Sequence, residues 1–230
     1  RRTLSGTGEG GWYPLMLSAD LAPGTTAGST MLGRDLAVWR DGQGQAHVWD
    51  DRCPHRGMRL SLGFVREGAL ACLYHGWRFG ADGRCVHIPA HPDLSPPGTI
   101  RVAPLRVAEC WGLIWAAAAD EGGALQEDDP ALTAASWVPV RSLRIEAPWQ
   151  GVAAAIGLPE GELAAVLDRD VDGRVLAALL PVGAGACMLH LLAAGPAEVV
   201  RLHDLADWGQ DVRARAEERA GQVFLAGAVA

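Results

Sequence analysis

The sequence predicts an all-β domain over residues 1–120 and a small α+β domain over residues 137–230, joined by a linker at residues 121–136. Three observations support this division. Short apolar runs rich in β-branched and aromatic residues fill the first half, with Gly and Asp turn signals between them. An acidic, Gly-containing stretch follows at residues 120–130. Beyond it lie longer apolar runs and one segment with the 3.6-residue spacing of a helix.

The strands expected in the first half are short, and their spacing favours a small barrel or sandwich. Turn signals at residues 41–44 and 81–84 indicate hairpins between neighbouring strands. The expected strands cover residues 12–17, 29–32, 36–40, 46–49, 69–73, 85–88, 105–108 and 113–116.

The second half is expected to form an antiparallel meander followed by a helix, as in a shortened α+β domain. The expected strands cover residues 137–145, 163–167, 174–180 and 187–192. The helix is expected over residues 204–220, with Asp204 as its N-cap and Gly221 as its stop. Four residues share its apolar face: Leu205, Trp208, Val212 and Ala216.

Composition and charge exclude several classes of protein. With 49% apolar and 20% charged residues in 230, the chain is not intrinsically disordered. Twenty Lys+Arg against 27 Asp+Glu give a net charge of −7, without a basic cluster, so neither nucleic acid nor an anionic membrane is an expected partner.

No signal peptide opens the sequence, so a cytoplasmic location is expected. The uncharged residues 175–197 include Pro181 and three glycines, which favours two strands around a turn over a membrane helix. Five cysteines, an odd number, do not suggest a disulfide framework.

The most informative pattern is a pair of Cys/His segments. Cys53 and His55 follow the pattern C-x-H, and after sixteen intervening residues Cys72 and His75 follow C-x-x-H. Two thiolates and two imidazoles on paired loops can hold a metal. A structural zinc site is the alternative, but zinc sites usually group Cys with Cys and His with His, whereas here each loop supplies one of each.

This interleaving resembles the Rieske [2Fe–2S] motif, in which one iron takes both cysteines and the other takes both histidines. The resemblance implies Cys53, His55, Cys72 and His75 as ligands. Gly57 and Gly76 would let the loops bend closely around the cluster. Such clusters have reduction potentials of about −150 to +300 mV.

Further segments resemble the Rieske non-haem iron oxygenases, over about the first 120 residues. They include WYP at 12–14, LGRD at 32–35, DRCPHRG at 51–57, YHGW at 74–77, DGRC at 82–85 and WGLIW at 111–115. The resemblance implies that Arg56 shields or orients the cluster and that Trp77 packs over it. Met58 and Tyr74 stand where cytochrome bc-type Rieske proteins place extra cysteines, which favours the oxygenase or soluble ferredoxin branch and the lower potentials.

In that family a larger C-terminal helix-grip domain binds a mononuclear iron through two His and one carboxylate. Here only His190 and His203 lie beyond the first domain, and they are separated by twelve residues and belong to different predicted elements. We therefore expect a shortened helix-grip domain that lacks a mononuclear iron site, and we predict no catalytic residue. The alternative is an iron site of His190, His203 and either Asp204 or Asp207.

Three functions stay open at this level. The first is an electron-transfer subunit of a Rieske-type oxygenase system, with a reductase or ferredoxin as donor and an oxygenase chain as acceptor. The second is a complete small oxygenase, a hydroxylase or demethylase, with the unconventional iron site. The third is a non-enzymatic redox sensor or scaffold. Whether the chain is itself an enzyme is not decided by the sequence, and assembly as a homo- or hetero-oligomer based on trimers is implied by the resemblance alone.

Overall fold

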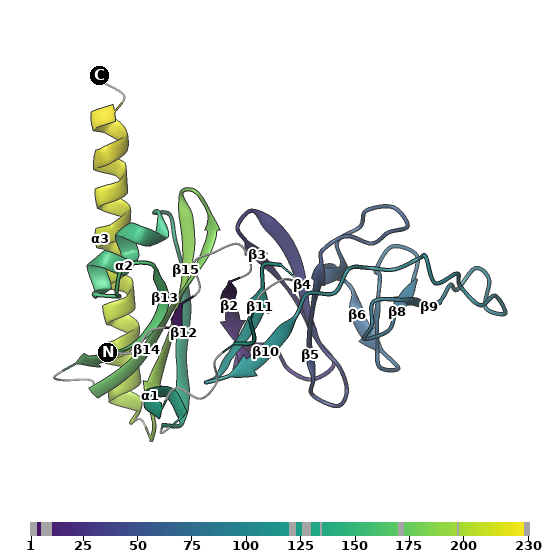
Figure 1. Cartoon of the computed structure of the whole chain (residues 1–230), viewed down its shortest axis with the longest axis horizontal. Coiled ribbons are helices and arrows are strands. Elements are labelled where there is room, and N and C mark those ends of the chain that lie inside the picture. The colour runs from purple at the N-terminus through teal and green to yellow at the C-terminus, as the bar shows by residue number, and fades with distance from the viewer. Residues whose placement is uncertain are drawn as a thin grey trace. The chain divides into compact units, whose positions relative to one another are not determined.

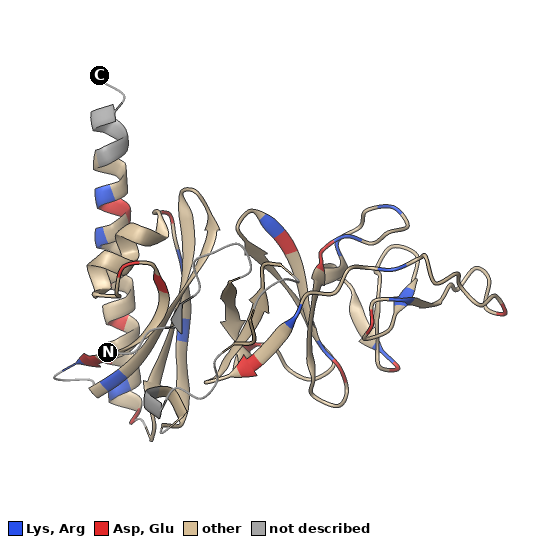
Figure 2. Cartoon of the chain, in the orientation of Figure 1, with Lys and Arg blue, Asp and Glu red and all other residues tan. Residues whose placement is uncertain are grey.

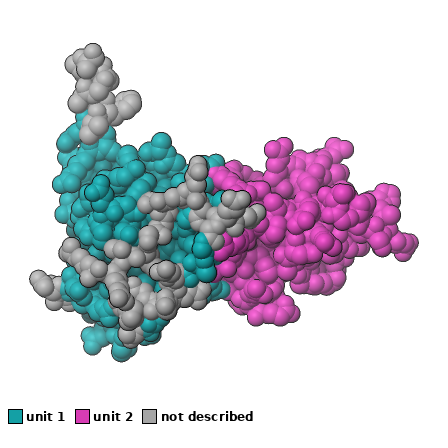
Figure 3. Space-filling model, viewed as in Figure 1, with its two compact units in different colours: residues 1–17, 31–33, 109–230 teal, residues 18–30, 34–108 magenta. Residues whose placement is uncertain are grey.

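The computed structural model describes residues 4–5, 11–119, 123–125, 130–133, 135–169, 173–196 and 198–227. Contacts divide the chain into two compact units, which are interleaved along the sequence (Figure 3). Unit 1 holds residues 1–17, 31–33 and 109–230, and unit 2 holds residues 18–30 and 34–108. These units follow contacts alone, and the domain boundaries expected at residues 120 and 137 stay a prediction.

Unit 2 is built on two small antiparallel sheets (Figure 1). The first has the order β3-β4-β5, with β3 (Thr26–Met31), β4 (Arg34–Arg40) and β5 (Ala46–Asp50). The second has the order β6-β7-β8-β9, with β6 (Phe64–Arg66), β7 (Ala69–Ala71), β8 (Arg78–Phe79) and β9 (Cys85–His87). Two 3-10 turns, η1 (Ser18–Asp20) and η2 (Leu60–Leu62), complete it.

A buried apolar core holds the sheets of unit 2 together and reaches the two Cys/His segments. Trp39, Trp49 and Phe79 are fully buried in this core, and Cys53 and Cys72 belong to the same cluster of side chains. Side chains that pack in one well-filled core constrain one another's positions. The two cysteines are therefore fixed by the core of the unit rather than by the loops alone.

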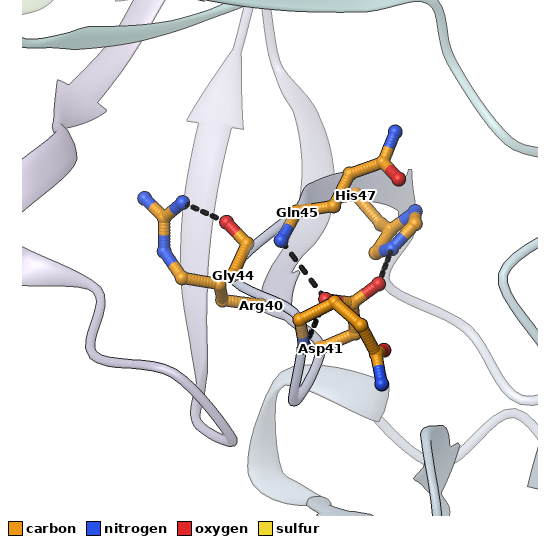
Figure 4. A network of polar contacts seen from close by, with 6 residues as sticks. Arg40, Asp41, Gly44, Gln45 and His47 are labelled. Atoms are coloured by element: carbon orange, nitrogen blue, oxygen red, sulfur yellow. Dashed lines mark hydrogen bonds and ion pairs between the residues drawn. The ribbon is translucent and has the colours of Figure 1, made fainter.

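The hairpin turn between β4 and β5 is fixed by a buried polar network (Figure 4). The Asp41 carboxylate accepts hydrogen bonds from the backbone N–H groups of Gln43 (3.0 Å) and Gln45 (2.9 Å) and contacts His47 Nε2 at 3.0 Å. Arg40 donates to the Gly44 carbonyl at 2.6 Å. Burial would raise the pKa of Asp41, but these hydrogen bonds outweigh it and lower that pKa. The turn predicted at residues 41–44 is confirmed.

Unit 1 contains a three-stranded sheet and a five-stranded sheet (Figure 1). The order β10-β11-β2 joins β10 (Val107–Cys110) and β11 (Leu113–Ala117) to β2 (Trp12–Leu17). The larger sheet has the order β1-β13-β14-β15-β12, with β1 (Leu4–Ser5), β13 (Glu162–Arg169), β14 (Gly173–Gly183), β15 (Ala186–Ala194) and β12 (Trp137–Ile145). The predicted antiparallel meander is confirmed, because β13, β14 and β15 are neighbours in sequence order.

The described residues of unit 1 form three helices: α1 (Pro130–Thr133), α2 (Trp149–Ile156) and α3 (Val199–Gly227). Helix α3 packs on the large sheet through β12 and β15, and its Leu205, Val212 and Ala216 are buried as expected. Its predicted ends were wrong. The helix begins five residues before Asp204, which is therefore no N-cap, and it continues through Gly221. A single Gly costs a helix only about 1 kcal/mol, which the flanking turns of α3 outweigh.

Helix α2 was not predicted, although its sequence carried a signal. Pro148 stands at the N-cap position, an Ala run fills the helix, and Gly157 ends it in the left-handed conformation with φ of +76°. The short length of the segment hid its periodicity. Together the sheets and α3 confirm the predicted fold class: an all-β first part and a small α+β second part with an antiparallel sheet and a C-terminal helix. No helix among the described residues is long and apolar enough to cross a membrane.

Candidate metal centre

The first Cys/His segment forms a tight loop between β5 and η2, which we call loop 1 (residues 53–58). The N–H of Cys53 donates to the Met58 carbonyl at 2.8 Å, and the N–H of Gly57 donates to the Cys53 carbonyl at 2.8 Å. Gly57 has φ of +73°, a conformation that costs other residues about 1–2 kcal/mol. At the start of the loop the buried Asp51 carboxylate accepts from the Ser61 backbone N–H (2.7 Å) and its hydroxyl (2.6 Å).

The second segment, loop 2 (residues 72–77), repeats this geometry between β7 and β8. The N–H of Cys72 donates to the Trp77 carbonyl at 2.9 Å, and the N–H of Gly76 donates to the Cys72 carbonyl at 3.0 Å. Gly76 has φ of +68°, and a Cβ there would lie 3.0 Å from Pro89 Cγ. The strand expected over residues 69–73 therefore ends at Ala71, because the chain turns into this loop. The two loops are two copies of one turn, each beginning at a Cys.

The side chains of the two loops meet in two like pairs. The Cys53 and Cys72 thiols are buried beside each other in the core. Burial and the neighbouring Cys72 thiol raise the pKa of Cys53 to about 11. The His55 and His75 rings lie toward the solvent side, with their centroids 4.7 Å apart. The predicted residues are thus brought together as a thiol pair inside and an imidazole pair outside.

Aromatic rings hold both imidazoles. Trp77 stacks on His55 with centroids 4.3 Å apart and an interplanar angle of 5°. The Tyr74 ring lies against the His75 ring, with their centroids 3.8 Å apart. The pKa of His55 is lowered by partial loss of hydration and by the positive charges of His75 and Arg56. Arg56 is exposed and acts on the site by its charge, whereas Trp77 contacts a predicted ligand of the other loop.

The donor set fits two metal ions better than one. Within the described part of the chain, no three His, Cys, Asp or Glu side chains lie close enough to share a single metal ion. A tetrahedral zinc would need all four donors in one shell. A [2Fe–2S] cluster needs two thiolates on one iron and two imidazoles on the other, which matches the pairs observed.

An open cleft of about 770 Å³ borders loop 1 within unit 2. Arginines and aspartates dominate its wall, and sequence reasoning missed it because its residues come from three separate segments, around residues 35, 50–59 and 101–103. Its charged lining residues are Asp35, Asp50, Asp51, Arg52, Arg56, Arg59 and Arg101, beside Cys53 and His55.

The second-half residues considered for an iron site are not brought together. His190 lies on β15 with only 1% of its surface exposed, and its Nδ1 is 2.8 Å from Ser142 Oγ. Burial lowers the pKa of His190 to about 4, opposed by the Pro14 backbone. His203, Asp204 and Asp207 are exposed on α3. Among the described residues these side chains form no group of three around one point.

Comparisons with known proteins agree with this geometry. The Rieske [2Fe–2S] domain family matches residues 11–104. Over 148 residues the chain is 36% identical to the oxidoreductase NdmD of Pseudomonas putida, covering 63% of this chain and 25% of that protein. It is 41% identical over 121 residues to the 3-chlorobenzoate-3,4-dioxygenase oxygenase subunit of Comamonas testosteroni, which covers 50% of this chain and 28% of that protein. It is also 37% identical over 156 residues to the 4beta-methylsterol monooxygenase of Methylococcus capsulatus, which covers 65% of this chain and 39% of that protein.

The chain thus spans about a quarter to two-fifths of the length of these curated relatives. Its fold is similar to the crystal structure of apo dicamba monooxygenase, with a TM-score of 0.72 at 18% identity, covering 99% of this chain and 90% of that one. Twin Cys/His loops, a thiol pair beside an imidazole pair, and a matching domain family lead to one assignment. Residues 11–104 match the Rieske [2Fe–2S] domain family, and the chain is similar to proteins named as oxygenase subunits and monooxygenases.

Proposed function

We propose that this protein relays single electrons through a [2Fe–2S] cluster held by Cys53, His55, Cys72 and His75, toward an acceptor on another chain. The observation that carries the proposal is the pairing of the side chains, thiol with thiol and imidazole with imidazole, on two copies of one turn. When bound, such a cluster would accept and donate single electrons at a reduction potential of about −150 to +300 mV.

The surrounding residues prepare the ligands for this role. Core packing keeps the two thiols together, and the stacked Trp77 ring limits the orientations of His55. Because burial raises the pKa of Cys53, iron must displace a proton from that thiol, so cluster assembly releases protons. His55 is half-buried and His75 is exposed, so the imidazole side of the cluster would face solvent and a redox partner.

The acceptor is proposed to be a mononuclear iron on an oxygenase chain. The names of the relatives support this. One relative is named an oxidoreductase, and others are named oxygenase subunits or components. A reductase or ferredoxin would supply the electrons. The cytoplasmic location and the trimer-based assembly stay predictions.

Iron content per chain, combined with EPR after reduction, tests the proposal. Anaerobically purified protein should contain about two irons and give a Rieske-type signal once reduced. About three irons would favour the alternative, a complete small oxygenase, and would call for an oxygenase assay. Two irons without any electron exchange with a ferredoxin or an oxygenase chain would favour the redox sensor or scaffold.

Ligand variants test the four residues directly. His55→Ala or Cys72→Ser should abolish the visible spectrum and destabilise the loops that the cluster joins. Cys85→Ser is the matched control, since Cys85 is buried in the same core but lies outside both loops. An unchanged spectrum in Cys72→Ser would refute the assignment. His190→Ala should leave the iron content unchanged, and loss of an iron would revive the complete oxygenase.

A further inference from the structure

The cleft beside loop 1 carries positive charge that the protein leaves without a partner. Asp35 forms an ion pair with Arg59 at 2.7 Å and accepts from Thr30 at 2.9 Å. Asp50 forms an ion pair with Arg34 at 2.5 Å. The acidic residues of the cleft wall are therefore already engaged, apart from the buried Asp51, whose oxygens are turned to Ser61.

Three arginines of the same wall are different. Arg52, Arg56 and Arg101 are exposed, and within the described residues their guanidinium groups make no ion pair or hydrogen bond. They come from loop 1, the residue before it and a separate segment near Val102. The fold thus gathers three unneutralised cations around one cleft whose wall includes His55.

The charge of the two units strengthens this observation. Unit 2 has ten Arg against eight Asp and Glu, whereas unit 1 has ten Arg against nineteen. The basic residues are all arginine, and Figure 2 shows them along the strands and loops of unit 2. A cationic surface on an otherwise acidic protein steers an anionic partner to one place and repels it from the rest.

We propose that this cleft, defined by Arg52, Arg56 and Arg101, is the docking site for the protein that donates electrons, through a carboxylate-rich face on that donor. The inference rests on the proposed electron relay. In each encounter the docked donor loses one electron and the cluster gains one, with His55 as the ligand nearest the contact. Guanidinium groups bind carboxylates in two-point contacts, which suits this choice of partner chemistry.

The test is stopped-flow reduction of the holoprotein by a prereduced, net-negative [2Fe–2S] ferredoxin at low and high salt. Arg101→Glu is the main variant because Arg101 lies outside both loops. Arg66→Glu is the matched control, with the same change of charge on exposed β6 outside the cleft. Photoreduced 5-deazariboflavin, a neutral small reductant, checks that each variant keeps a reducible cluster.

Arg101→Glu should slow reduction by the ferredoxin about tenfold at low salt, with the difference fading at high salt, while Arg66→Glu stays near the wild type. Reduction by the flavin should be unchanged in both. Equal slowing by the two variants would mean a net-charge effect and would overturn the docking site. If inorganic phosphate slows reduction by the ferredoxin more than chloride does at equal ionic strength, the cleft is a site for small anions. That result would also overturn the docking site.

Failure of the underlying relay looks different. If the flavin reduces the wild type but the ferredoxin does not, the proposed electron relay itself fails along with the docking site. If the ferredoxin reduces all three proteins equally fast at low salt, the relay stands and only the docking site is wrong.

Discussion

His190 is a buried imidazole inside the large sheet of unit 1, and its Nδ1 lies 2.8 Å from Ser142 Oγ. Its pKa is lowered to about 4 by burial, whereas an unfolded chain would give it the ordinary value near 6.5. Between these values the unfolded state binds a proton that the folded state does not. Folding stability is therefore complete above about pH 6.5 and falls as the pH drops toward 4.

We expect this residue to remove about 3 kcal/mol from the free energy of unfolding between pH 7 and pH 4. Urea unfolding at several pH values measures the loss. His190→Leu should flatten the pH dependence, while His203→Leu, on the exposed surface of α3, should keep the wild-type slope. A wild-type slope in His190→Leu would show that other groups cause the acid sensitivity.

Trp77 contributes at the same scale, through its parallel stack on His55. Removing the ring frees the imidazole to turn away, and aromatic pairs contribute about 0.5–1.5 kcal/mol beyond their buried area. Trp77→Leu should lose its visible absorbance several times faster than wild type under air, and Trp77→Phe should lie near wild type. Equal rates in all three proteins would leave the stack without a role in retaining the cluster.

At the scale of elements, α3 shows how one residue type acts differently at two positions. A Cβ at Gly209 would lie 2.7 Å from Leu143 Cδ1 and 2.9 Å from Leu191 Cδ1, so the helix packs on the sheet at van der Waals distance there. A Cβ at Gly221 would meet nothing within 4 Å. Gly209 therefore serves close packing, and Gly221 is a tolerated weak point in the helix.

Alanine substitutions test this difference. Gly221→Ala should raise the free energy of unfolding by about 0.5 kcal/mol through helix propensity. Gly209→Ala should lower it by about 1 kcal/mol, because overpacking costs about 1–3 kcal/mol and outweighs the gain in propensity. Chemical denaturation of both variants measures the two effects. Stabilisation by Gly209→Ala would show that the sheet yields to the added methyl group.

At the scale of the whole molecule, the two compact units should depend on iron to different degrees. The proposed ligands Cys53 and Cys72 belong to the core of unit 2, whereas unit 1 has its own core around β14 and β15. Removing the cluster leaves the two thiols in the core without the metal that joins them. Because the free energy of metal binding contributes to the free energy of folding, unit 2 should lose stability.

Calorimetry of the holoprotein and of chelator-treated apoprotein should show one transition moving to lower temperature and the other unchanged. Amide hydrogen exchange should place the weakened segments at residues 34–108. Equal shifts of both transitions, or loss of protection in β14 and β15, would mean that the units unfold as one.

Much of this molecule follows from local sequence. The strands of the large sheet, the hairpin at residues 41–44 and the Cys/His spacings are readable because each depends on residues a few positions apart. Helix α2 was too short for its period to show, and the ends of α3 were misjudged because a cap-like Asp204 and a Gly221 carry little energy against continued helix.

The sequence by itself determined the fold class, the family resemblance and the identity of the four candidate ligands. Only the tertiary structure decided that Cys53 lies beside Cys72 and His55 beside His75, and that Arg101 joins loop 1 around a cleft. Periodicity and turn chemistry act over a few residues and leave a trace in the sequence. Contacts between distant segments depend on how the sheets pack, and packing is settled only when the whole chain has folded.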